Sequence, residues 1–531
     1  MSHKNSHAET YAQKASFAHV LCTTSSAAGQ IGTSLEPIFD SDHTSVVFSS
    51  NVSDDITYTA DAGTFTFSRA GVYHIILVAN TQQESSSNNH SFEMKLNSES
   101  AFYVGQKWVN TGYNPVESTH QTIVSITAAD VLHLRMKTAG NTATIIQGTS
   151  VIITEITSGH YASQLVTANG TTTDVAEYNP FDTNLSGNPS SYTTVTAGMT
   201  VTGADGSFTA NSAGRYLIMV SNYFVMAVQG GGPALITMKL KKGGTTFATR
   251  AVMAIIGDDV AENTFCLIED LGAGDVLTIT WTTNDTDAGQ GVRANIGTNF
   301  SAYRLHEEVH TNGDTSGFFG YPYISVQNAE TDFTSTAAEV SPFDTNSYDS
   351  ANSFDTRTSG GITFTNADGK FTVDEPGLYT IVFAPVFSIA NGKTVVTKIK
   401  VNGTTQVEGT GKVANGPDPL DKTTIAFLEL NKGDYVEVTV DRSSGSTTFK
   451  CDLGTSIAIY RYFGFFKTED TVADGLIDND FTINTFSQGN LSNQYEKSVD
   501  QVPFKMGIRG PGTLRGRGTR PSVVKLGDKK N

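Results

Sequence analysis

The chain has 531 residues, of which 38% are hydrophobic and only 17% are charged, and its formal net charge is −18. This length is typical of three or four domains, since a domain usually has about 100–200 residues. The charge is unevenly spread: residues 501–531 hold eight basic residues and one acid, so the rest of the chain carries −25. Such an acidic body repels nucleic acids and anionic membranes.

The first 15 residues are polar, and we expect them to form a loose N-terminal arm. They lack the apolar segment of a secretory signal, and no stretch of the chain approaches the ~18 apolar residues of a membrane span. We therefore expect a protein that is made in a host cytoplasm without a signal peptide and has no membrane partner. The three cysteines, Cys22, Cys266 and Cys451, lack zinc or disulfide spacing and are expected to be buried free thiols.

One sequence block recurs three times along the chain. In each occurrence a glycine is followed two residues later by phenylalanine, eight residues later by a second glycine and ten residues later by tyrosine. The sets are Gly63, Phe65, Gly71 and Tyr73, then Gly206, Phe208, Gly214 and Tyr216, then Gly369, Phe371, Gly377 and Tyr379. Further landmarks keep the same order around each set, ending in Gly-Thr and an apolar strand at 148–156, 297–305 and 454–462. The chain therefore contains three tandem copies of one unit.

The pattern inside each copy predicts strands. Alternating apolar and polar residues indicate a strand with one wet face, and the continuous apolar runs after Gly71, Gly214 and Gly377 indicate a central, buried strand. Turn signals recur at short intervals without a helical stripe, which favours an all-β fold of antiparallel jelly-roll sandwiches. The expected organisation is an N-terminal arm at 1–15, jelly-roll repeats at 16–157, 158–306 and 307–463, and an extended, irregular C-terminal arm at 464–531 that is basic from 501.

The repeated string Gly-x-Phe-x5-Gly-x-Tyr, followed later by Leu-x2-Gly-Asp-x-Val, resembles the C1q/TNF-like jelly-roll superfamily. The second element is matched by Leu271, Gly274, Asp275 and Val276, and by Leu430, Gly433 and Asp434, whereas the first copy has Ala129 in place of the glycine. The resemblance implies a ten-strand jelly roll that packs as a trimer. It implies no particular ligand, and no collagen-like stalk precedes the three copies.

Two assemblies are compatible with three tandem copies. The linker at 157–163 spans at most ~25 Å at about 3.3 Å per residue, so neighbouring copies must touch or nearly touch. The copies could close on one another as a single-chain pseudo-trimer, or three chains could form a homotrimer at every level and build a shaft. A second linker at 307–322 is polar and Gly-rich and then aromatic.

The C-terminal arm cannot bury enough apolar surface to fold alone. We expect it to become ordered on a partner surface, where Arg509, Arg515, Arg517, Arg520 and Lys525 would pair with carboxylates. Contact with nucleic-acid phosphates and a purely solubilising role are the alternatives.

The sequence offers no motif for catalysis, and we expect no enzyme activity, cofactor or metal. Asp40, Asp42, Asp54, Asp55, Asp258, Asp259, Asp285 and Asp287 could bind Ca²⁺, but they lack EF-hand spacing and are better explained as solvated loop residues. Trp281 and Trp108 are each expected in a core or an interface.

These features together favour a structural protein of a virion surface, either a capsid decoration protein or a fibre. Its C-terminal arm would dock on other virion proteins of the capsid or neck. The alternative is a receptor-binding or glycan-binding adhesin that grips a host surface with loops that differ between copies, such as 83–91, 228–234 and 284–291.

Overall fold

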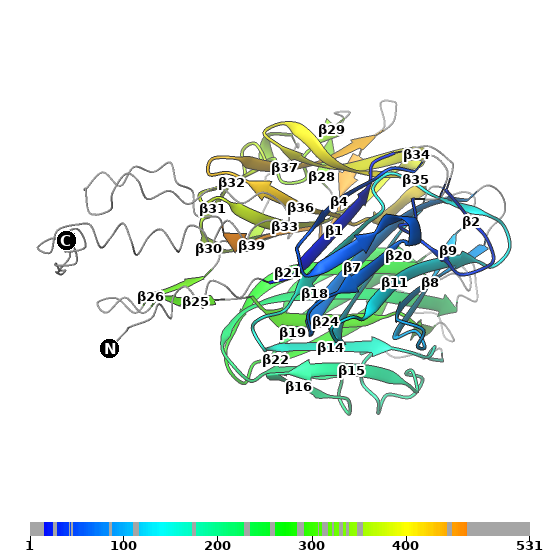
Figure 1. Cartoon of the computed structure of the whole chain (residues 1–531). Coiled ribbons are helices and arrows are strands. Elements are labelled where there is room, and N and C mark those ends of the chain that lie inside the picture. The colour runs from blue at the N-terminus through cyan, green and yellow to red at the C-terminus, as the bar shows by residue number, and fades with distance from the viewer. Residues whose placement is uncertain are drawn as a thin grey trace, which may run out of the picture.

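A computed structural model describes residues 15–24, 29–41, 43, 46–83, 88–109, 116–171, 177–227, 234–254, 261–283, 291–305, 307–310, 317–320, 323–328, 333–335, 339–347, 354–442 and 449–464. Across these ranges the chain forms strands that pair antiparallel, with two single-turn 3-10 helices at Ala60–Ala62 and Thr345–Ser347 and no α-helix. The predicted all-β class is confirmed. The strands form three β-sandwiches, each with one sheet that faces the other two sandwiches, called its inner sheet, and one outer sheet (Figure 1).

The first sandwich contains strands β1 to β13. Its inner sheet has the order β2-β12-β7-β13-β1-β4, with β10 beside β7, and its outer sheet has the order β5-β6-β11-β8-β9, with β3 beside β11. The strands are β1 Phe17–Cys22, β2 Gly29–Ile31, β3 Glu36–Pro37, β4 Phe48–Val52, β5 Ile56–Thr59, β6 Thr64–Phe67, β7 Gly71–Gln83, β8 Asn88–Leu96, β9 Tyr103–Val109, β10 Val116–Ile126, β11 Val131–Thr138, β12 Ala143–Ile145 and β13 Ser150–Glu155.

The second sandwich contains strands β14 to β24. Its inner sheet consists of the pair β14-β15 and the strands β21-β18-β23, with β24 beside β18, and its outer sheet has the order β16-β17-β22-β19-β20. The strands are β14 Tyr161–Val166, β15 Tyr192–Ala197, β16 Met199–Thr202, β17 Ser207–Ala210, β18 Gly214–Ala227, β19 Ala234–Lys242, β20 Thr245–Ala254, β21 Ala261–Leu271, β22 Val276–Thr283, β23 Gly291–Ala294 and β24 Asn299–Arg304.

The third sandwich contains strands β27 to β39. Its inner sheet has the order β30-β27-β39-β33-β36, and its outer sheet has the order β28-β38-β34-β37-β32-β31, with β29 beside β37 and β35 beside β34. The strands are β27 Tyr323–Asn328, β28 Phe333–Ser335, β29 Glu339–Val340, β30 Phe354–Gly360, β31 Ile362–Thr365, β32 Lys370–Val373, β33 Gly377–Ala384, β34 Val386–Val401, β35 Thr404–Asp421, β36 Thr424–Leu430, β37 Tyr435–Arg442, β38 Phe449–Cys451 and β39 Ser456–Gly464.

The three sandwiches share one strand order. Strands β4-β1-β13-β7-β10 of the first correspond to β15-β14-β24-β18-β21 of the second and to β30-β27-β39-β33-β36 of the third. The register agrees as well, since Gly71 lies opposite Ile126, Gly214 opposite Leu271 and Gly377 opposite Leu430. The sequence repeat is therefore a structural repeat at the level of individual residue pairs.

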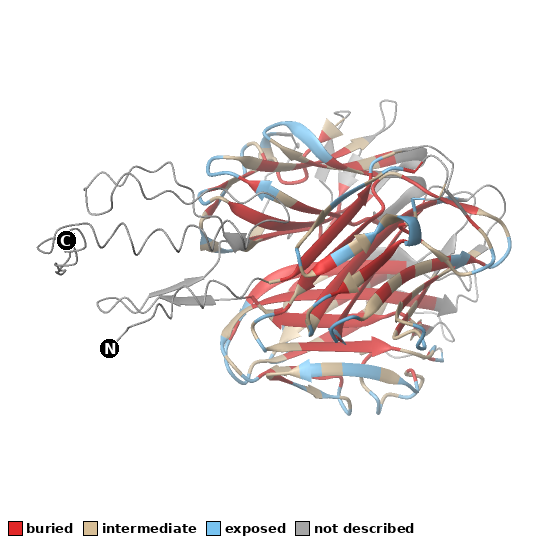
Figure 2. Ribbon diagram, viewed as in Figure 1, coloured by how far each residue is buried: buried red, intermediate tan, exposed pale blue. Residues whose placement is uncertain are grey.

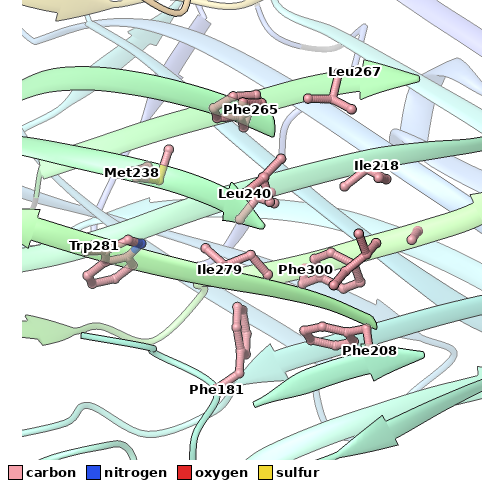
Figure 3. Packing of buried hydrophobic residues seen from close by; sticks show 14 of the residues in the cluster. Phe181, Phe208, Ile218, Met238, Leu240, Phe265, Leu267, Ile279, Trp281 and Phe300 are labelled. Carbon is pink, nitrogen blue, oxygen red and sulfur yellow. The ribbon is translucent and has the colours of Figure 1, made fainter. Parts of the chain in front are cut away.

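Each sandwich has an apolar core of its own between its two sheets. In the second sandwich Phe208 stacks on Phe300 with ring centroids 3.7 Å apart, and Trp281 lies 5.3 Å from Tyr178. Figure 3 shows Phe208, Phe300 and Trp281 among the side chains that fill the space between the sheets. Of the two positions predicted for Trp281, a core or an interface, the structure shows the core, and the predicted burial of the three free cysteines is confirmed.

The repeated glycines and tyrosines have structural roles. Gly63, Gly206 and Gly369 all adopt a left-handed conformation, with φ of 59°, 61° and 65°, next to backbone atoms that leave no room for a side chain. The tyrosines that close each block, Tyr73, Tyr216 and Tyr379, are buried, and each hydroxyl donates to the backbone carbonyl four residues earlier in the chain. These bonds fix the short connection that leads into the central strand.

The linkers differ in part from the prediction. Residues 161–163 belong to β14, the first strand of the second sandwich, so fewer residues join the first two sandwiches than expected. Within the second linker, Glu307–His310 (β25) pairs with Gly317–Gly320 (β26) as a hairpin. The predicted N-terminal arm up to residue 14 and the C-terminal arm from residue 465 lie outside the described residues.

Candidate functional site: the contact between the sandwiches

The three inner sheets meet in a shared apolar core. This common core contains buried residues of all three sandwiches, and Figure 2 shows the buried strands gathered where the sandwiches face one another. Its members include Phe17, Ile76, Val78, Ile123 and Ile152 of the first sandwich, Leu217, Met219, Cys266, Ile268 and Tyr303 of the second, and Leu378, Val382, Ile425, Phe427 and Tyr460 of the third. Of the two assemblies compatible with the sequence, the chain thus has the contacts of a single-chain pseudo-trimer.

The first strand of each sandwich reaches into its neighbour. Leu21 packs in the core of the third sandwich, and the equivalent Leu165 packs in the core of the first. At the same position in the third sandwich, Gln327 donates from Nε2 to the carbonyl oxygen of Thr249 in the second, at 2.7 Å. The contacts therefore run in one direction around a closed cycle, as expected for a pseudo-threefold arrangement.

A ring of three buried carboxylates repeats the same cycle. Glu262 of the second sandwich accepts from the backbone N of Thr119 in the first, Asp421 of the third accepts from Thr264 N in the second at 2.7 Å, and Glu117 of the first accepts from Thr423 N in the third at 2.7 Å. We call Glu117, Glu262 and Asp421 the carboxylate ring. Each member stands two residues before the threonine of its own sandwich that donates to the next carboxylate. Each carboxylate thus satisfies a backbone donor that would otherwise be buried without a partner.

The cations near the ring differ from one boundary to the next. Between the second and third sandwiches, Arg250 is fully buried, pairs with Asp421 and donates to the carbonyl oxygens of Ala384 and Gly454, each at 2.8 Å. Between the third and first sandwiches the cation is Lys422, whose Nζ donates to Oδ1 of Asn80 at 3.0 Å. The two boundaries are therefore chemically distinct although their backbones correspond.

The boundary between the first and second sandwiches uses an imidazole and amides. The ring of His120 stacks on Tyr223 with centroids 5.3 Å apart, and its Nδ1 lies 2.8 Å from the Tyr223 hydroxyl. Further along the same boundary, Gln121 Nε2 donates to Oδ1 of Asn299 at 2.7 Å. Because each boundary carries its own polar pairs, the order of the three sandwiches around the cycle is specified.

The beginning of the first sandwich and the end of the third meet at the opposite end of the common core. The Tyr462 hydroxyl donates to the carbonyl oxygen of Ser16 at 2.9 Å, and the rings of Tyr462 and Phe17 both pack against Phe427. Leu305 and Tyr323, which flank the second linker, belong to the same common core. The first and last described strands and the residues on either side of the second linker therefore come together at this end, which we call the arm end.

Burial shifts the protonation of several groups at the boundaries. It raises the pKa of Glu117 against the opposing effect of the Lys422 ammonium, and it lowers the pKa of Lys422 against Glu117 and Asp421. Burial also lowers the pKa of His19 and of His74 to about 4, in the latter case against a hydrogen bond from the imidazole to Gln121 Oε1. Both histidines are thus neutral at physiological pH.

The sites predicted from sequence fall largely outside this region. Arg509, Arg515, Arg517, Arg520 and Lys525 lie outside the described residues, as do Asp42, Asp258, Asp259, Asp285 and Asp287. Asp55 accepts from the Ser16 hydroxyl at 3.1 Å and pairs with Arg69, so it belongs to the arm end. In the described ranges no three His, Cys, Asp or Glu side chains are grouped as a metal site would require, and no helix there is long and apolar enough to cross a membrane.

The carboxylate ring was missed at the level of the sequence, although a signal for it exists. When the copies are aligned on the residue that pairs with the second repeat glycine, an acid followed two positions later by threonine recurs nine residues upstream: Glu117 and Thr119, Glu262 and Thr264, Asp421 and Thr423. Acids and threonines are common in this chain, so only the alignment separates these pairs from the background.

Comparison with known proteins locates the resemblance in the third sandwich. Residues 325–456 match the C1q domain family. A solved structure described as Eiger TNF from S. frugiperda aligns with 28% of this chain and 99% of its own, at 11% identity and a TM-score of 0.20. No curated protein matches the chain.

Proposed function

We propose that this chain is a non-enzymatic structural protein of a virion surface, a capsid decoration protein or a fibre, that docks on the particle through its basic C-terminal arm. The observation that carries the proposal is the bond between Tyr462 and Ser16 at 2.9 Å. It brings the start of the first sandwich to the end of the third, so that the cycle of sandwiches closes and the residues to which the two arms are attached lie at one end.

The common core supports a displayed body rather than a catalyst. The three inner sheets bury one another, and among the described residues only Val47 is a large hydrophobic residue with high exposure. A body whose apolar faces are satisfied internally needs no further subunit to fold, and its outer surface stays available. We expect a solution mass near that of one chain, 56.6 kDa, whereas a threefold larger mass would favour a shaft of trimers.

The docking role is tested by deleting residues 501–531. We expect the deletion to reduce incorporation into particles while the circular dichroism of the body stays unchanged. A second variant replaces Arg509, Arg515, Arg517, Arg520 and Lys525 with Glu at full length, and deletion of residues 1–15 is the control. Unchanged incorporation of both arm variants would refute docking through the basic arm.

The second candidate function is binding of a host receptor or glycan. The strands β7 and β18 begin near the arm end, where Ile156 N donates to Val72 O and Leu305 N to Arg215 O, and they run to the opposite end. Two of the loops that differ between copies, 83–91 and 228–234, follow these strands in the chain. A glycan array and a host-adsorption assay with the full chain test this function. If the chain binds a host receptor or glycan through these loops, exchange of residues 228–233 should change the binding.

A further inference from the structure

Lys422, Asn80 and Glu117 lie together at the boundary between the third and first sandwiches. Lys422 and Asn80 are each 1% exposed and Glu117 is 5% exposed. Lys422 Nζ donates to Asn80 Oδ1 at 3.0 Å, and Glu117 Oε2 accepts from the backbone N of Thr423, the residue next to Lys422, at 2.7 Å. A primary amine, a carboxamide and a carboxyl group are therefore enclosed together at the boundary between two sandwiches.

Among the described residues, this combination occurs at one boundary only of the pseudo-threefold cycle. The residues equivalent to Lys422 in the other sandwiches are Ser118 and Asn263, each following a member of the carboxylate ring. At the boundary between the first and second sandwiches, Ser118 Oγ lies 3.4 Å from the Tyr223 hydroxyl. Neither serine nor asparagine supplies an amine. The backbone arrangement therefore occurs three times, but the combination of amine, carboxamide and carboxyl groups does not.

The surroundings of the three groups suit an acyl transfer to the amine. Burial lowers the pKa of the Lys422 ammonium, which makes its neutral, nucleophilic form accessible near physiological pH. Burial raises the pKa of Glu117, so the carboxyl can hold a proton or release it. The positive charge of Lys422 lowers the pKa of Glu117, and the negative charge of Glu117 raises the pKa of Lys422, so each opposes the effect of burial on the other. The Nδ2 group of Asn80, which would leave, has no hydrogen-bond partner among the described residues.

We propose that Lys422 and Asn80 join spontaneously in an isopeptide bond, with Glu117 as the group that carries the proton. The Glu117 carboxylate first takes a proton from the Lys422 ammonium. The neutral Nζ then attacks Cγ of Asn80, and the N–C bond forms as the C–Nδ2 bond breaks. Nδ2 takes one proton from Glu117 and one from Nζ and leaves as an ammonium ion, which restores the Glu117 carboxylate, so no oxidant or other co-reactant is needed.

The distances agree with a contact that precedes this reaction. Asn80 Cγ lies one carbonyl bond, about 1.23 Å, from the Oδ1 atom that Lys422 contacts at 3.0 Å, so Nζ lies at most about 4.2 Å from Cγ, and a small movement of the flexible lysine stem brings the two atoms within reach. Gly409 borders the lysine stem, and a Cβ there would lie 3.1 Å from Lys422 Cε. The bond would close the chain covalently between its first and third sandwiches.

Mass spectrometry of the full chain tests the proposal. We expect the intact protein to be lighter than its sequence mass by one ammonia molecule, and proteolysis to yield one cross-linked species that contains Asn80 and Lys422. Succinimide formation at an Asn-Gly pair also releases ammonia, so the cross-linked peptide decides between the two. A folded chain in which residues 80 and 422 are recovered only in separate peptides would overturn the proposal.

Variants assign the roles. Lys422→Met should abolish the cross-link, and Asn80→Asp should replace the loss of ammonia by a loss of water. Glu117→Gln should slow the reaction at least about 100-fold and remove its pH dependence, as expected for loss of a proton carrier. Lys241→Met, which removes a lysine that pairs with Glu177 on an outer sheet at 2.7 Å, is the control and should leave the cross-link intact. Wild-type kinetics in Glu117→Gln would contradict its role. If Lys422→Met or Asn80→Asp fails to fold, the wild-type mass still decides the proposal.

Discussion

The hydroxyl groups of Tyr303 and Tyr460 lie 2.9 Å apart across the boundary between the second and third sandwiches. They stand at equivalent positions of β24 and β39, since Met219 pairs with Ser301 and Val382 with Ala458 two residues earlier. Thr154 holds the same position in β13. Three copies of one strand therefore bring different side chains to the same layer of the common core.

Removal of either hydroxyl should lower the free energy of unfolding by about 1 kcal/mol, because the other hydroxyl loses a buried partner. The double variant Tyr303→Phe with Tyr460→Phe should cost less than the sum of the two single variants, by about 0.5–1 kcal/mol. Urea unfolding of the four proteins measures the coupling. As a control cycle, Tyr216→Phe, which removes a bond inside the second sandwich, should add to Tyr460→Phe without coupling. Additive effects of Tyr303 and Tyr460 would show that their contact is absent in solution.

Arg250→Met should destabilise the protein by about 3–5 kcal/mol. The substitution leaves the Asp421 carboxylate and the carbonyl groups of Ala384 and Gly454 buried without their cationic donor. Arg135→Met is the control, because Arg135 is partly exposed and its Nε lies 3.7 Å from Glu93 Oε1. Such an exposed pair contributes only about 0–1 kcal/mol. The free energy of unfolding is measured with urea. If the two variants lost similar amounts of it, the buried contacts of Arg250 at the boundary between the second and third sandwiches would be contradicted.

Ala129→Gly should stabilise the first sandwich by about 1 kcal/mol, because Ala129 adopts a left-handed conformation that costs an L-residue about that much. Its φ is 75°, and the equivalent glycines, Gly274 and Gly433, have φ of 90° and 89°. The reciprocal change Gly274→Ala should cost a similar amount, since a Cβ there meets no atom within 4 Å and only the backbone is strained. Thermal unfolding of both variants measures the two changes in stability. A loss of stability on Ala129→Gly would contradict the left-handed conformation of Ala129.

Acid should weaken the boundaries of the first sandwich. His74 has a pKa of about 4 in the folded protein and about 6.5 when unfolded, so its contribution is complete above pH 6.5 and is lost as the pH falls toward 4. His19 also has a pKa lowered to about 4 by burial, so its contribution to stability is likewise lost as the pH falls. Its ring centroid lies 6.3 Å from that of Phe427 in the third sandwich. We therefore expect His74→Gln to reduce the loss of stability between pH 7 and pH 5 by about 2 kcal/mol.

The control for His74 is His90→Gln. His90 has the same lowered pKa of about 4 through burial, but its Nδ1 faces Thr81 within the first sandwich. Glu117, whose raised pKa adds stability as the pH falls, is present in both variants and in the parent protein, which carries neither substitution. Its effect therefore cancels when each variant is compared with the parent. Only His74→Gln should reduce the acid-induced exposure of Cys266, which lies in the common core, to a thiol reagent that reacts at low pH. Equal exposure of Cys266 in the parent and in His74→Gln would show that protonation of His74 does not open this boundary.

The repeat could be read from the sequence because it depends on local requirements that each copy must meet alone. A left-handed turn needs glycine at Gly63, Gly206 and Gly369, and a buried tyrosine hydroxyl needs the carbonyl four residues earlier, so the spacing persists in every copy. The continuous apolar runs likewise indicate central strands whatever lies beyond them. Fold class, strand positions and the number of copies follow from such signals.

By itself the sequence determined three jelly rolls in series, and it left open whether they close on one another. The tertiary structure decided that point and placed Glu117 opposite Thr423, Arg250 beside Asp421, and Lys422 on Asn80. The physical reason is that these partners stand 171 to 342 residues from one another and in different copies, so no local pattern links them. A side chain of an inner sheet looks the same in sequence whether it faces solvent, another chain or a neighbouring copy, and only the packing of the sheets distinguishes these cases.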